Sequence, residues 1–501
     1  MRKINFGWAE IDLTPEKKVA LSGQFAERIS EYVEKSITAT ALAVDNGKEQ
    51  MILVSCDLVG TPCNLIDAVR DRVQDNNVGI DPMKIVLNAI HTHTAPEFPR
   101  MQRSKIPFLS STPKQIIKSL LPPGKEYLEK ENVTENGEIL SPEAYFDILV
   151  ERIGKVILTA WSKREEGSFC NAFGRAAVGM CRRAVYSDGT AQMWGDTDRA
   201  AFVELESGND SGIELLYVFD QNKKLTGIVA NLACPAQCVQ HRLFVSPDFW
   251  GEVKVLLRNH FGEDVYLLPQ CSAAGDQCPV DLIRWVEPES SVNDPNIERK
   301  NPWNRKADPS MFDLAGMRKV GRRIANEIIE VYQEGLGELQ TEPEFTHHVR
   351  IFELPIRRAT LTEAENAKRA IREYLRDIEG DVNYIDAAKL QVHMGILKRL
   401  EVQDIQDVLD TEVHIMRLGT IAIATNPFEL FLDYGNQIKA RSHAEQTFLI
   451  QLANGGEGYL PTAKAERGGH YSAFISGGQV GHEGGDLLVR ETLNEINTKL
   501  F

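Results

Sequence analysis

The sequence predicts an α/β fold in which mixed β-sheets are flanked by helices within one large domain. Short apolar runs with strand character alternate with amphipathic helical patterns through the first half of the chain. The 501 residues, of which 43% are hydrophobic, suffice for one very large domain or for two to four ordinary ones. No internal repeat or low-complexity tract divides the chain, which favours a single domain over residues 1–501.

The amino-terminal part contains a strand pair, a helix and a further strand. Residues 37–45 (ITATALAVD) and 50–60 (QMILVSCDLVG) read as paired strands, and residues 64–76 (NLIDAVRDRVQDN) as an amphipathic helix. Residues 84–90 (KIVLNAI) predict a strand that leads directly into two histidines. A polar insertion over about 101–145 then interrupts the pattern, and segments of this kind often cover the mouth of a site.

Helices and strands alternate again after the insertion. A helical period covers residues 145–161, and further strands are expected at 214–220, 225–234 and 265–271. An irregular polar excursion occupies about 285–310, and a strongly amphipathic helix follows over 314–335. Residues 361–411 predict a helical arm, a pair of charged helices that we expect to be solvated and without chemistry of its own.

Composition argues against several classes of partner. The formal net charge of −16 repels nucleic acid and anionic lipid headgroups, and no basic run overrides it. The amino terminus lacks the apolar core of a signal peptide, and no apolar stretch reaches the roughly 18 residues of a membrane span. We therefore expect a cytoplasmic protein as written, or a secreted or periplasmic one if a leader was removed, and leave its oligomeric state open.

The eight cysteines are too sparse for a disulfide framework, and reduced thiols are expected. A structural zinc site is conceivable, but its three- and six-residue gaps match the usual zinc-binding spacings poorly; its ligands would be Cys234, Cys238, Cys271 and Cys278.

His91 and His93 are the most informative residues of the chain. They follow an apolar strand pattern at a spacing of two, which on a strand places both side chains on one face. Two imidazoles at the carboxyl edge of a sheet are a common arrangement around a metal, although a pair of hydrogen-bonded surface histidines would show the same pattern.

Other catalytic signatures are missing. The sequence has no GxSxG elbow, no Walker A loop and no GxGxxG fingerprint. The HxH pair lacks the following Asp-His of metallo-β-lactamase-type sites, and an amidohydrolase barrel would place the pair on its first strand.

Six motifs in a fixed order resemble the catalytic domain of the neutral, non-lysosomal ceramidases. They are HTHTAP at 91–96, CRR at 181–183, NLACPAQ with SPDFWG at 231–251, AAGDQCP at 273–279, NPFEL at 426–430, and LANGGEGYLPTAKAERGGHYSA at 452–473. The opening IDLTP at 11–15 fits the same pattern. The resemblance implies a zinc amidase, and this chain would lack the carboxyl-terminal β-sandwich that some members carry.

The resemblance also implies a site. His91, Glu429 and Tyr459 match three of the four zinc ligands of the family, and nitrogen, carboxylate and phenolate donors suit zinc. His93 matches a second histidine that hydrogen-bonds near the reacting amide, and Tyr471 matches a phenol that stabilises the oxyanion. Arg182 matches an arginine that lines the pocket.

Two positions depart from the family pattern. Cys234 stands where the second histidine ligand is expected; a thiolate would serve as a ligand, and His241 is another candidate for the same role. Cys278 replaces the serine that usually acts as nucleophile, and it is either a nucleophile or a small buried apolar residue.

These features predict a metal-dependent hydrolase that cleaves the amide bond of an N-acyl substrate, ceramide-like or soluble, with one zinc ion and metal-activated water. A hydrolase of another ester or amide class, and a degenerate ligand-binding member of the same fold, are the alternatives. Asp57, Asp248 and Asp276 follow strand-like runs or turns, where we expect them to cap helices or orient other side chains.

Overall fold

The computed structural model describes residues 2–24, 27–103, 110–128, 138–286, 306–308, 311–337 and 339–501. For residues 284–286 and 306–308 it describes the backbone alone.

The centre of the molecule is a mixed sheet of eight strands in the order β16-β14-β13-β8-β1-β4-β5-β6. The strands are β1 (Asn5–Asp12), β4 (Thr38–Asp45), β5 (Gln50–Cys56), β6 (Ile85–Ala89), β8 (Glu165–Arg175), β13 (Gly212–Asp220), β14 (Leu225–Leu232) and β16 (Tyr266–Cys271). Within this sheet, β5 pairs in parallel with β6 and β14 with β16, and the other neighbouring strands are antiparallel. The side chain of Asn88 in β6 donates a hydrogen bond to the Pro269 carbonyl in β16 (3.2 Å), so the two edge strands of the sheet approach each other.

The expected amino-terminal elements are confirmed. The paired strands are β4 and β5, which are antiparallel, and the predicted helices are α1 (Cys63–Gln74) and α4 (Pro142–Ser162). Alternate residues of β4 belong to two different buried clusters. Ala39, Ala41 and Ala43 pack toward α1 and α4, whereas Leu42 and Val44 belong to a cluster on the opposite face of the sheet. The small alanines allow the helices to approach the sheet closely.

A second sheet packs against the first one. It has the order β20-β21-β22-β24, with β20 (Phe345–Pro355), β21 (Val408–Leu418), β22 (Ile421–Thr425) and β24 (Gln446–Ile450). One buried cluster contains residues of both sheets, among them Trp8 and Leu216 of the first and Met416 and Phe448 of the second. This shared core joins the two sheets face to face.

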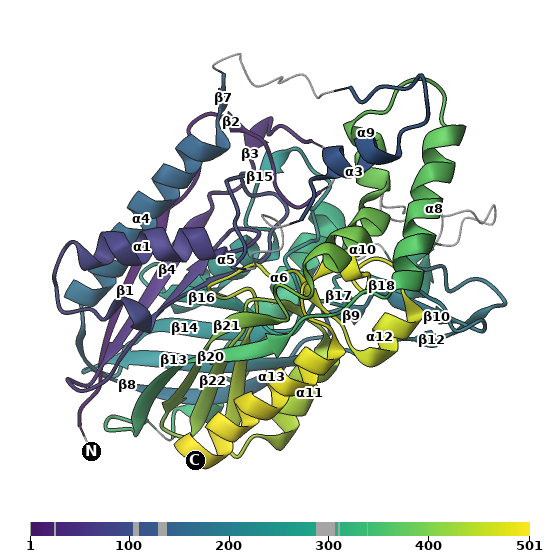
Figure 1. Cartoon of the computed structure of the whole chain (residues 1–501). Helices are drawn as coiled ribbons and strands as arrows, with labels where there is room; N and C mark the ends of the chain where they lie inside the picture. The colour runs from purple at the N-terminus through teal and green to yellow at the C-terminus, as the bar shows by residue number, and fades with distance from the viewer. Residues whose placement is uncertain are drawn as a thin grey trace.

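Helices cover the remaining faces (Figure 1). The helices α5 (Phe249–Phe261) and α6 (Asp313–Glu330) contribute to the core on the β13 and β14 side. The helices α11 (Leu432–Arg441) and α13 (His482–Glu495) cover the second sheet. The predicted fold class, mixed sheets flanked by helices, is therefore confirmed. No helix within the described ranges is long and apolar enough to cross a membrane.

Short elements complete the chain. They are β2 (Lys18–Val19), β3 (Tyr32–Val33), β7 (Ile139–Leu140), β9 (Met180–Cys181), β10 (Arg183–Tyr186), β11 (Ala191–Met193), β12 (Phe202–Leu205), β15 (Phe244–Val245), β17 (Gln277–Cys278), β18 (Asp281–Val286), β19 (Lys306–Asp308), β23 (Glu429–Leu430), β25 (Tyr459–Leu460), α3 (Pro113–Leu120), α7 (Tyr332–Gly335), α12 (Ala463–Gly468), η1 (Pro82–Lys84), η5 (Ile475–Gly477) and η6 (Ile496–Leu500).

The helical arm differs from the expected pair of helices. It contains α8 (Leu361–Asp377), α9 (Tyr384–Lys389) and α10 (Gln391–Val402), and β21 begins before residue 411, where the arm was expected to end. The extra helix arises because the Asn383 side chain accepts hydrogen bonds from the backbone N–H groups of Ile385 and Asp386, which starts a new helix after the turn.

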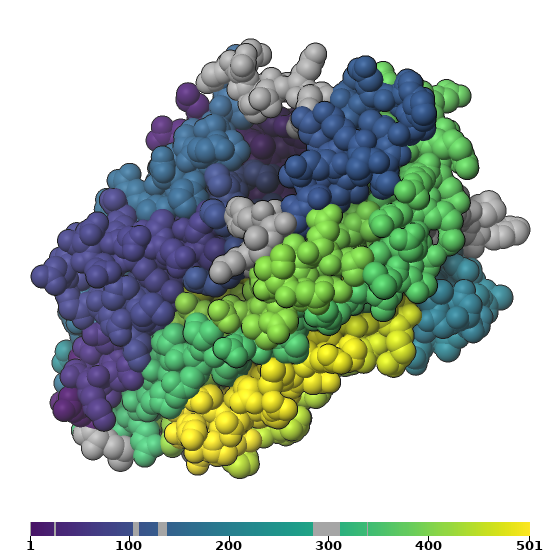
Figure 2. All heavy atoms as spheres, viewed as in Figure 1, coloured from purple at the N-terminus to yellow at the C-terminus, as the bar shows by residue number. Residues whose placement is uncertain are grey.

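The arm is also packed against another segment. Ile116 and Ile117 of α3 share a buried cluster with Ile371 of α8 and Met394 of α10. Figure 2 shows the α3 segment (blue) lying directly on the green surface of the arm. The predicted polar insertion at 101–145 therefore contains a helix that packs on the arm, although residues 104–109 and 129–137 lie outside the described ranges. Most of the predicted excursion at 285–310 also lies outside them, and β18 and β19 border it.

Candidate active site

Several parallel strands end at the same region of the molecule. His91 follows β6, Cys234 follows β14 and Gly275 follows β16, while Glu429 lies shortly after β22 of the second sheet. The carboxyl ends of parallel strands are a frequent location for ligand sites in α/β proteins. Segments that are distant in sequence therefore meet here.

His91 is held in a left-handed backbone conformation just after β6. The strand ends at Ala89, and His91 has φ = 65°. The expectation that strand alternation aligns His91 with His93 is therefore wrong in its reason, because neither residue belongs to the strand. The two rings are nevertheless adjacent, with centroids 5.0 Å apart. The Nδ1–H group of His91 donates to the Val59 carbonyl at 2.6 Å, which fixes the orientation of the ring.

Glu429 and Tyr459 are neighbours across a two-stranded parallel ladder. β23 pairs with β25 so that Glu429 lies directly opposite Tyr459. The chain after β16 presses against this ladder: a Cβ atom on Gly275 would lie 2.3 Å from the Glu429 carbonyl oxygen. Glycine is required at position 275 because no side chain fits between the two backbones.

The His91 ring nitrogen meets both the carboxylate and the second histidine. His91 Nε2 lies 3.4 Å from Glu429 Oε2 and 3.4 Å from His93 Nε2. The Tyr459 hydroxyl also forms a hydrogen bond with the Glu429 carboxylate. The structure thus brings together His91, His93, Glu429 and Tyr459.

Arg182 and Gln237 connect this group from the other side. Arg182 Nη2 donates to the Gly275 carbonyl (2.9 Å) and to the Tyr459 hydroxyl (3.3 Å), and Nη1 reaches Gln237 Oε1 (3.4 Å). Gln237 Nε2 in turn lies 3.0 Å from His93 Nε2 and donates to it. Sequence reasoning missed Gln237, although it is the last residue of the NLACPAQ motif.

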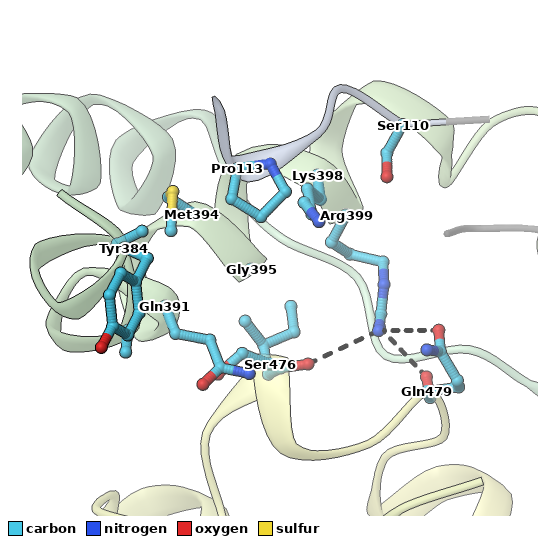
Figure 3. Close-up of a pocket in the computed structure, with 13 residues that line it drawn as sticks. Ser110, Pro113, Tyr384, Gln391, Met394, Gly395, Lys398, Arg399, Ser476 and Gln479 are labelled. Carbon is cyan, nitrogen blue, oxygen red and sulfur yellow. Dashed lines mark hydrogen bonds between the residues drawn. The ribbon is translucent and has the colours of Figure 1, made fainter. Parts of the chain in front are cut away.

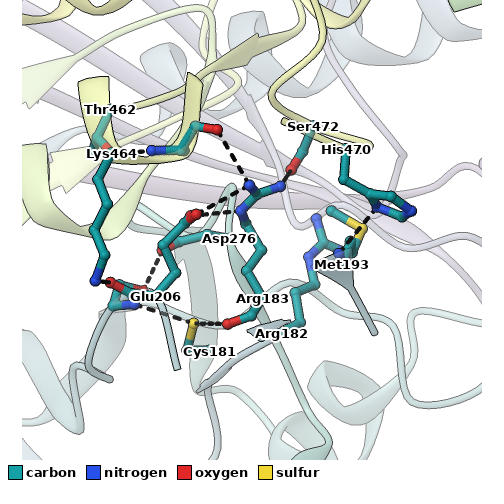
Figure 4. Close-up of polar contacts among 12 residues, drawn as sticks. Cys181, Arg182, Arg183, Met193, Glu206, Asp276, Thr462, Lys464, His470 and Ser472 are labelled. Atoms are coloured by element: carbon teal, nitrogen blue, oxygen red, sulfur yellow. Dashed lines mark hydrogen bonds and ion pairs between the residues drawn. The ribbon is translucent and has the colours of Figure 1, made fainter. Parts of the chain in front are cut away.

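Tyr471 lies at the rim of the site and belongs to a firmly held loop. Its ring centroid is 5.6 Å from that of Tyr459, and the residue is 37% exposed, so its phenol can meet a bound ligand. Arg183, which is fully buried, donates to the Tyr471 carbonyl (2.8 Å) and to the Gly469 carbonyl (2.8 Å). Arg183 also forms a two-nitrogen ion pair with Glu206, at 2.5 and 3.1 Å (Figure 4). The two adjacent arginines therefore have different roles: Arg182 faces the site, and Arg183 holds the Tyr471 loop.

Burial and neighbouring charges set the protonation of the group. Burial opposes ionisation of Glu429, but His91 and Arg182 outweigh it and lower the pKa of Glu429. Burial, together with the positive charges of His91 and nearby arginines, lowers the pKa of His93 well below its usual value, so His93 is neutral near pH 7. Burial and the Glu429 charge raise the pKa of Tyr459 well above its usual value. The site therefore combines the Glu429 carboxylate with the neutral His93 imidazole and the neutral Tyr459 phenol.

Cys234 and His241 are not brought into this group by any described contact. The Cys234 thiol is fully buried and directed at the Val178 carbonyl at 3.5 Å, and burial raises its pKa well above the usual range. His241 Nε2 lies 3.7 Å from Asp313 Oδ1, and its ring stacks on Phe312. Their assignment as alternative metal ligands stays a prediction.

Cys278 is packed in a small apolar cluster. Its thiol lies 3.4 Å from the Val280 carbonyl, and its neighbours include Leu282 and Phe312. The residue is fully buried on β17, close enough to Arg182 for the two charges to interact when the thiol ionises. None of the eight cysteines forms a disulfide and all are buried, in agreement with the expected reduced thiols.

His91 and Glu429 have the spacing of two ligands of one zinc ion. The separation of 3.4 Å between His91 Nε2 and Glu429 Oε2 equals the edge of a tetrahedron with zinc–ligand bonds of about 2.0–2.1 Å. The bond from His91 Nδ1 to a backbone carbonyl is the usual way to orient a metal-binding imidazole. Within the described part of the chain, no group of three or more His, Cys, Asp or Glu side chains could hold a metal. Tyr459 would have to supply the third donor.

Comparison with known proteins identifies the class of fold. The neutral ceramidase from Pseudomonas aeruginosa superposes with a TM-score of 0.65 at 16% identity, over 99% of this chain and 74% of that chain. A ceramidase complexed with C2 gives a TM-score of 0.64 at 14% identity, over 99% of this chain and 75% of that one. No protein-family model and no curated protein matches the sequence.

The chain therefore has the fold of the larger part of neutral ceramidase, and the expected resemblance is confirmed at the level of the fold. At these identities the likeness describes the architecture alone.

Proposed function

We propose that the protein is a metal-dependent hydrolase that cleaves the amide bond of an N-acyl substrate. The observation that carries the proposal is the buried pair of His91 and Glu429, 3.4 Å apart, beside Tyr459 and Arg182 at the meeting point of several strand ends. The ceramidase fold supports the same chemistry. One zinc ion bound by His91, Glu429 and Tyr459 would supply Lewis-acid polarisation and a more acidic water.

The other side chains have separate tasks in this scheme. The Tyr471 phenol donates a hydrogen bond to the oxygen that becomes negative as the carbonyl is attacked, and the Arg182 guanidinium provides a fixed positive charge. His93, which is neutral and turned toward His91, gives up the hydrogen bond from Gln237 when Nε2 accepts a proton, and it then transfers that proton to the leaving amine. Gln237 holds the His93 ring in place through the 3.0 Å hydrogen bond to Nε2.

The substrate is a ceramide-like lipid or a soluble N-acyl amine. A ceramidase of this fold is known in complex with C2, which favours testing lipid amides first. A cytoplasmic location stays a prediction, and nucleic acid is not an expected partner because the net charge is −16.

The test is hydrolysis of a panel of long-chain and short-chain N-acyl amines before and after chelation, with zinc added back. We expect chelation to abolish hydrolysis, zinc to restore it, and His91→Ala to remove it. Hydrolysis that is indifferent to His91→Ala, or that zinc cannot restore, would contradict the proposal.

A second candidate is a ligand-binding protein that has lost turnover. It is favoured by the two cysteines at family site positions, since the Cys234 and Cys278 thiols are both buried against backbone carbonyls. Elemental analysis separates the candidates. Stoichiometric zinc that disappears in Glu429→Gln but not in the exposed control Glu353→Gln supports the enzyme, and a metal-free protein that binds N-acyl amines without cleaving them supports the second candidate. Esterase substrates belong in the same panel, because the site would also serve another ester or amide class.

A further inference from the structure

A separate pocket lies where the helical arm meets the η5 segment. It has a volume of about 380 Å³, which falls in the lower part of the range of about 300–1,000 Å³ that small-molecule sites occupy. Its walls come from the start of α3, from α9 and α10, and from residues 475–479 (Figure 3). The sequence predicted an arm without chemistry, and packing against α3 and η5 creates this cavity.

The charge of the pocket is positive. Its lining contains Lys398 and Arg399 but no Asp or Glu. Among the described residues, no carboxylate is a charge partner of Arg399, whereas Lys398 interacts electrostatically with Glu401. The Glu401 carboxylate also accepts a hydrogen bond from the Ser111 backbone N–H at 2.7 Å. In a protein of net charge −16, a lining with two cations and no Asp or Glu marks a local preference for an anion.

Arg399 forms the floor of the pocket and is only 3% exposed. Its two terminal nitrogens donate to backbone carbonyls, among them Gln479 (3.0 Å) and Gly478 (3.0 Å). Its buried Nε–H group has no hydrogen-bond partner among the described residues. Burial lowers the pKa of Arg399 to about 10, which leaves the guanidinium charged at neutral pH. A buried, charged donor without a partner is costly unless a ligand compensates it.

The remaining wall is largely apolar. Tyr384, Met394 and Ile475 line it together with Pro113. Met394 is buried and Tyr384 is half exposed, at 49%. A methionine adapts its shape to different apolar ligands, so this wall suits an aliphatic body more than a second charge.

The pocket is distinct from the candidate active site. One short segment separates them: Ser476 and Gln479 line the pocket, whereas a Cβ atom on Gly477 would lie 3.7 Å from the Tyr459 ring. The bridge between Gly458 and Gly478 ties the same segment to the strand that carries Tyr459. A ligand in the pocket would therefore lie behind Tyr459 without touching the reacting groups.

We infer that this pocket binds a small organic carboxylate with an aliphatic body, whose charge faces Lys398 and Arg399 and whose chain lies along Met394 and Ile475. The inference does not depend on hydrolysis at the His91 site. It gives the arm a function in ligand binding.

Calorimetric titration of the full chain with octanoate, 1-octanol and octylammonium tests the inference, since the three probes share a chain and differ in charge. We expect octanoate to bind about tenfold more tightly than either of the others. Lys398→Met should weaken the binding of octanoate about tenfold and leave the binding of 1-octanol unchanged. Ala388→Trp, at the exposed edge of the pocket, should weaken the binding of both octanoate and 1-octanol. Arg399 is not a suitable first target, because its carbonyl contacts hold the η5 segment.

Two controls locate the binding. Lys368→Met changes a partly exposed lysine on α8, which pairs with Glu365 outside the pocket, and it should leave octanoate binding as in the unmodified protein. His91→Ala should also leave it unchanged, whether or not the proposed hydrolysis exists. Equal affinities for octanoate and octylammonium would overturn the inference. So would loss of octanoate binding in His91→Ala with retention in Lys398→Met, because that result would place the ligand in the active site.

Discussion

Gly23 lies directly against the imidazole of His93. A Cβ atom at this position would lie 2.4 Å from His93 Cγ, and the residue has φ = +94°. The Arg28 side chain also donates to the His93 carbonyl at 2.6 Å, so the loop of residues 21–24 and 27–28 supports this histidine from two directions. Backbone conformation and contact both select glycine here.

Gly23→Ala should therefore lower the free energy of unfolding more than the same substitution at a glycine that has a positive φ but open space around it. We expect it to lower the free energy of unfolding by about 1–3 kcal/mol more than Gly189→Ala, because overpacking is added to backbone strain. Gly189 is the matched control, with φ = +82° and nothing within 4 Å of a Cβ atom. Urea unfolding measures both variants, and equal losses would show that the contact with His93 has no energetic role.

Asp57 and Asp248 are buried carboxyl groups whose roles are structural. Asp248 caps α5, and Asp57 accepts hydrogen bonds from the backbone and side chain of Thr38. Burial raises the pKa of each to about 6. The native carboxyl groups thus hold their protons to higher pH than the unfolded chain does, so their contribution to stability is complete below about pH 4 and is lost as the pH rises to about 6.

Asp57→Asn should remove part of this pH dependence. Asparagine keeps an oxygen acceptor for Thr38 but does not ionise, so the stability of the unmodified protein relative to the variant should fall by up to about 3 kcal/mol between pH 4 and pH 6. Unfolding at several pH values measures the difference, with the exposed change Asp75→Asn as control. If the free energies of unfolding of the variant and of the unmodified protein changed with pH in the same way, the raised pKa of Asp57 would be contradicted.

At the scale of elements, the strand β10 and the loop of residues 465–472 form one unit. Arg183 and Glu206 are both buried, and their ion pair is surrounded by carbonyl groups of the loop that also accept hydrogen bonds from Arg183. The Met193 backbone N–H donates to His470 Nδ1 at 3.1 Å and adds a further contact. The position of Tyr471 therefore depends on an arginine that does not face the site.

Arg183→Lys should loosen this loop while retaining the positive charge. Lysine cannot reproduce the two-nitrogen contact with Glu206 together with the carbonyl contacts, so we expect a loss of about 2 kcal/mol in the free energy of unfolding. Hydrogen exchange at residues 469–472 should become faster, and the exposed Arg467→Lys on α12 should show neither effect. Unchanged exchange at these amides would mean that other contacts hold Tyr471.

At the scale of the whole molecule, the two sheets share a core. Trp8 of the first sheet and Met416, Ile423 and Phe448 of the second belong to the same buried cluster. Neither sheet can bury these side chains alone. We therefore expect the two sheets to unfold together, as the predicted single domain requires.

Met416→Ala tests this expectation. Methionine 416 is fully buried in the second sheet, and its truncation should cost about 2–5 kcal/mol. Tryptophan fluorescence and far-ultraviolet circular dichroism should report one common transition at a lower denaturant concentration, whereas the exposed Met83→Ala should leave it in place. Two separate transitions would indicate two independent domains.

Local pattern predicted much of the fold, because hydrophobic period is a property of neighbouring residues. The alternation in β4 and β5 and the helical period of α1, α4 and α6 were readable without tertiary information. The number of helices in the arm could not be predicted in this way, because a single capping residue, Asn383, starts the extra helix. The motifs placed His91, Glu429 and Tyr459 in one site only through resemblance, since no local pattern relates residues so far apart in the chain.

The sequence by itself determined the class of fold and the absence of a basic run. The tertiary structure alone decided the orientation of each polar group: the Cys234 thiol turns toward the Val178 carbonyl, the His91 ring is fixed by the Val59 carbonyl, and Gln237 joins Arg182 to His93. Backbone carbonyls are acceptors at every residue and leave no signal in the sequence, so which of them meets a given side chain depends on how the sheets and loops pack.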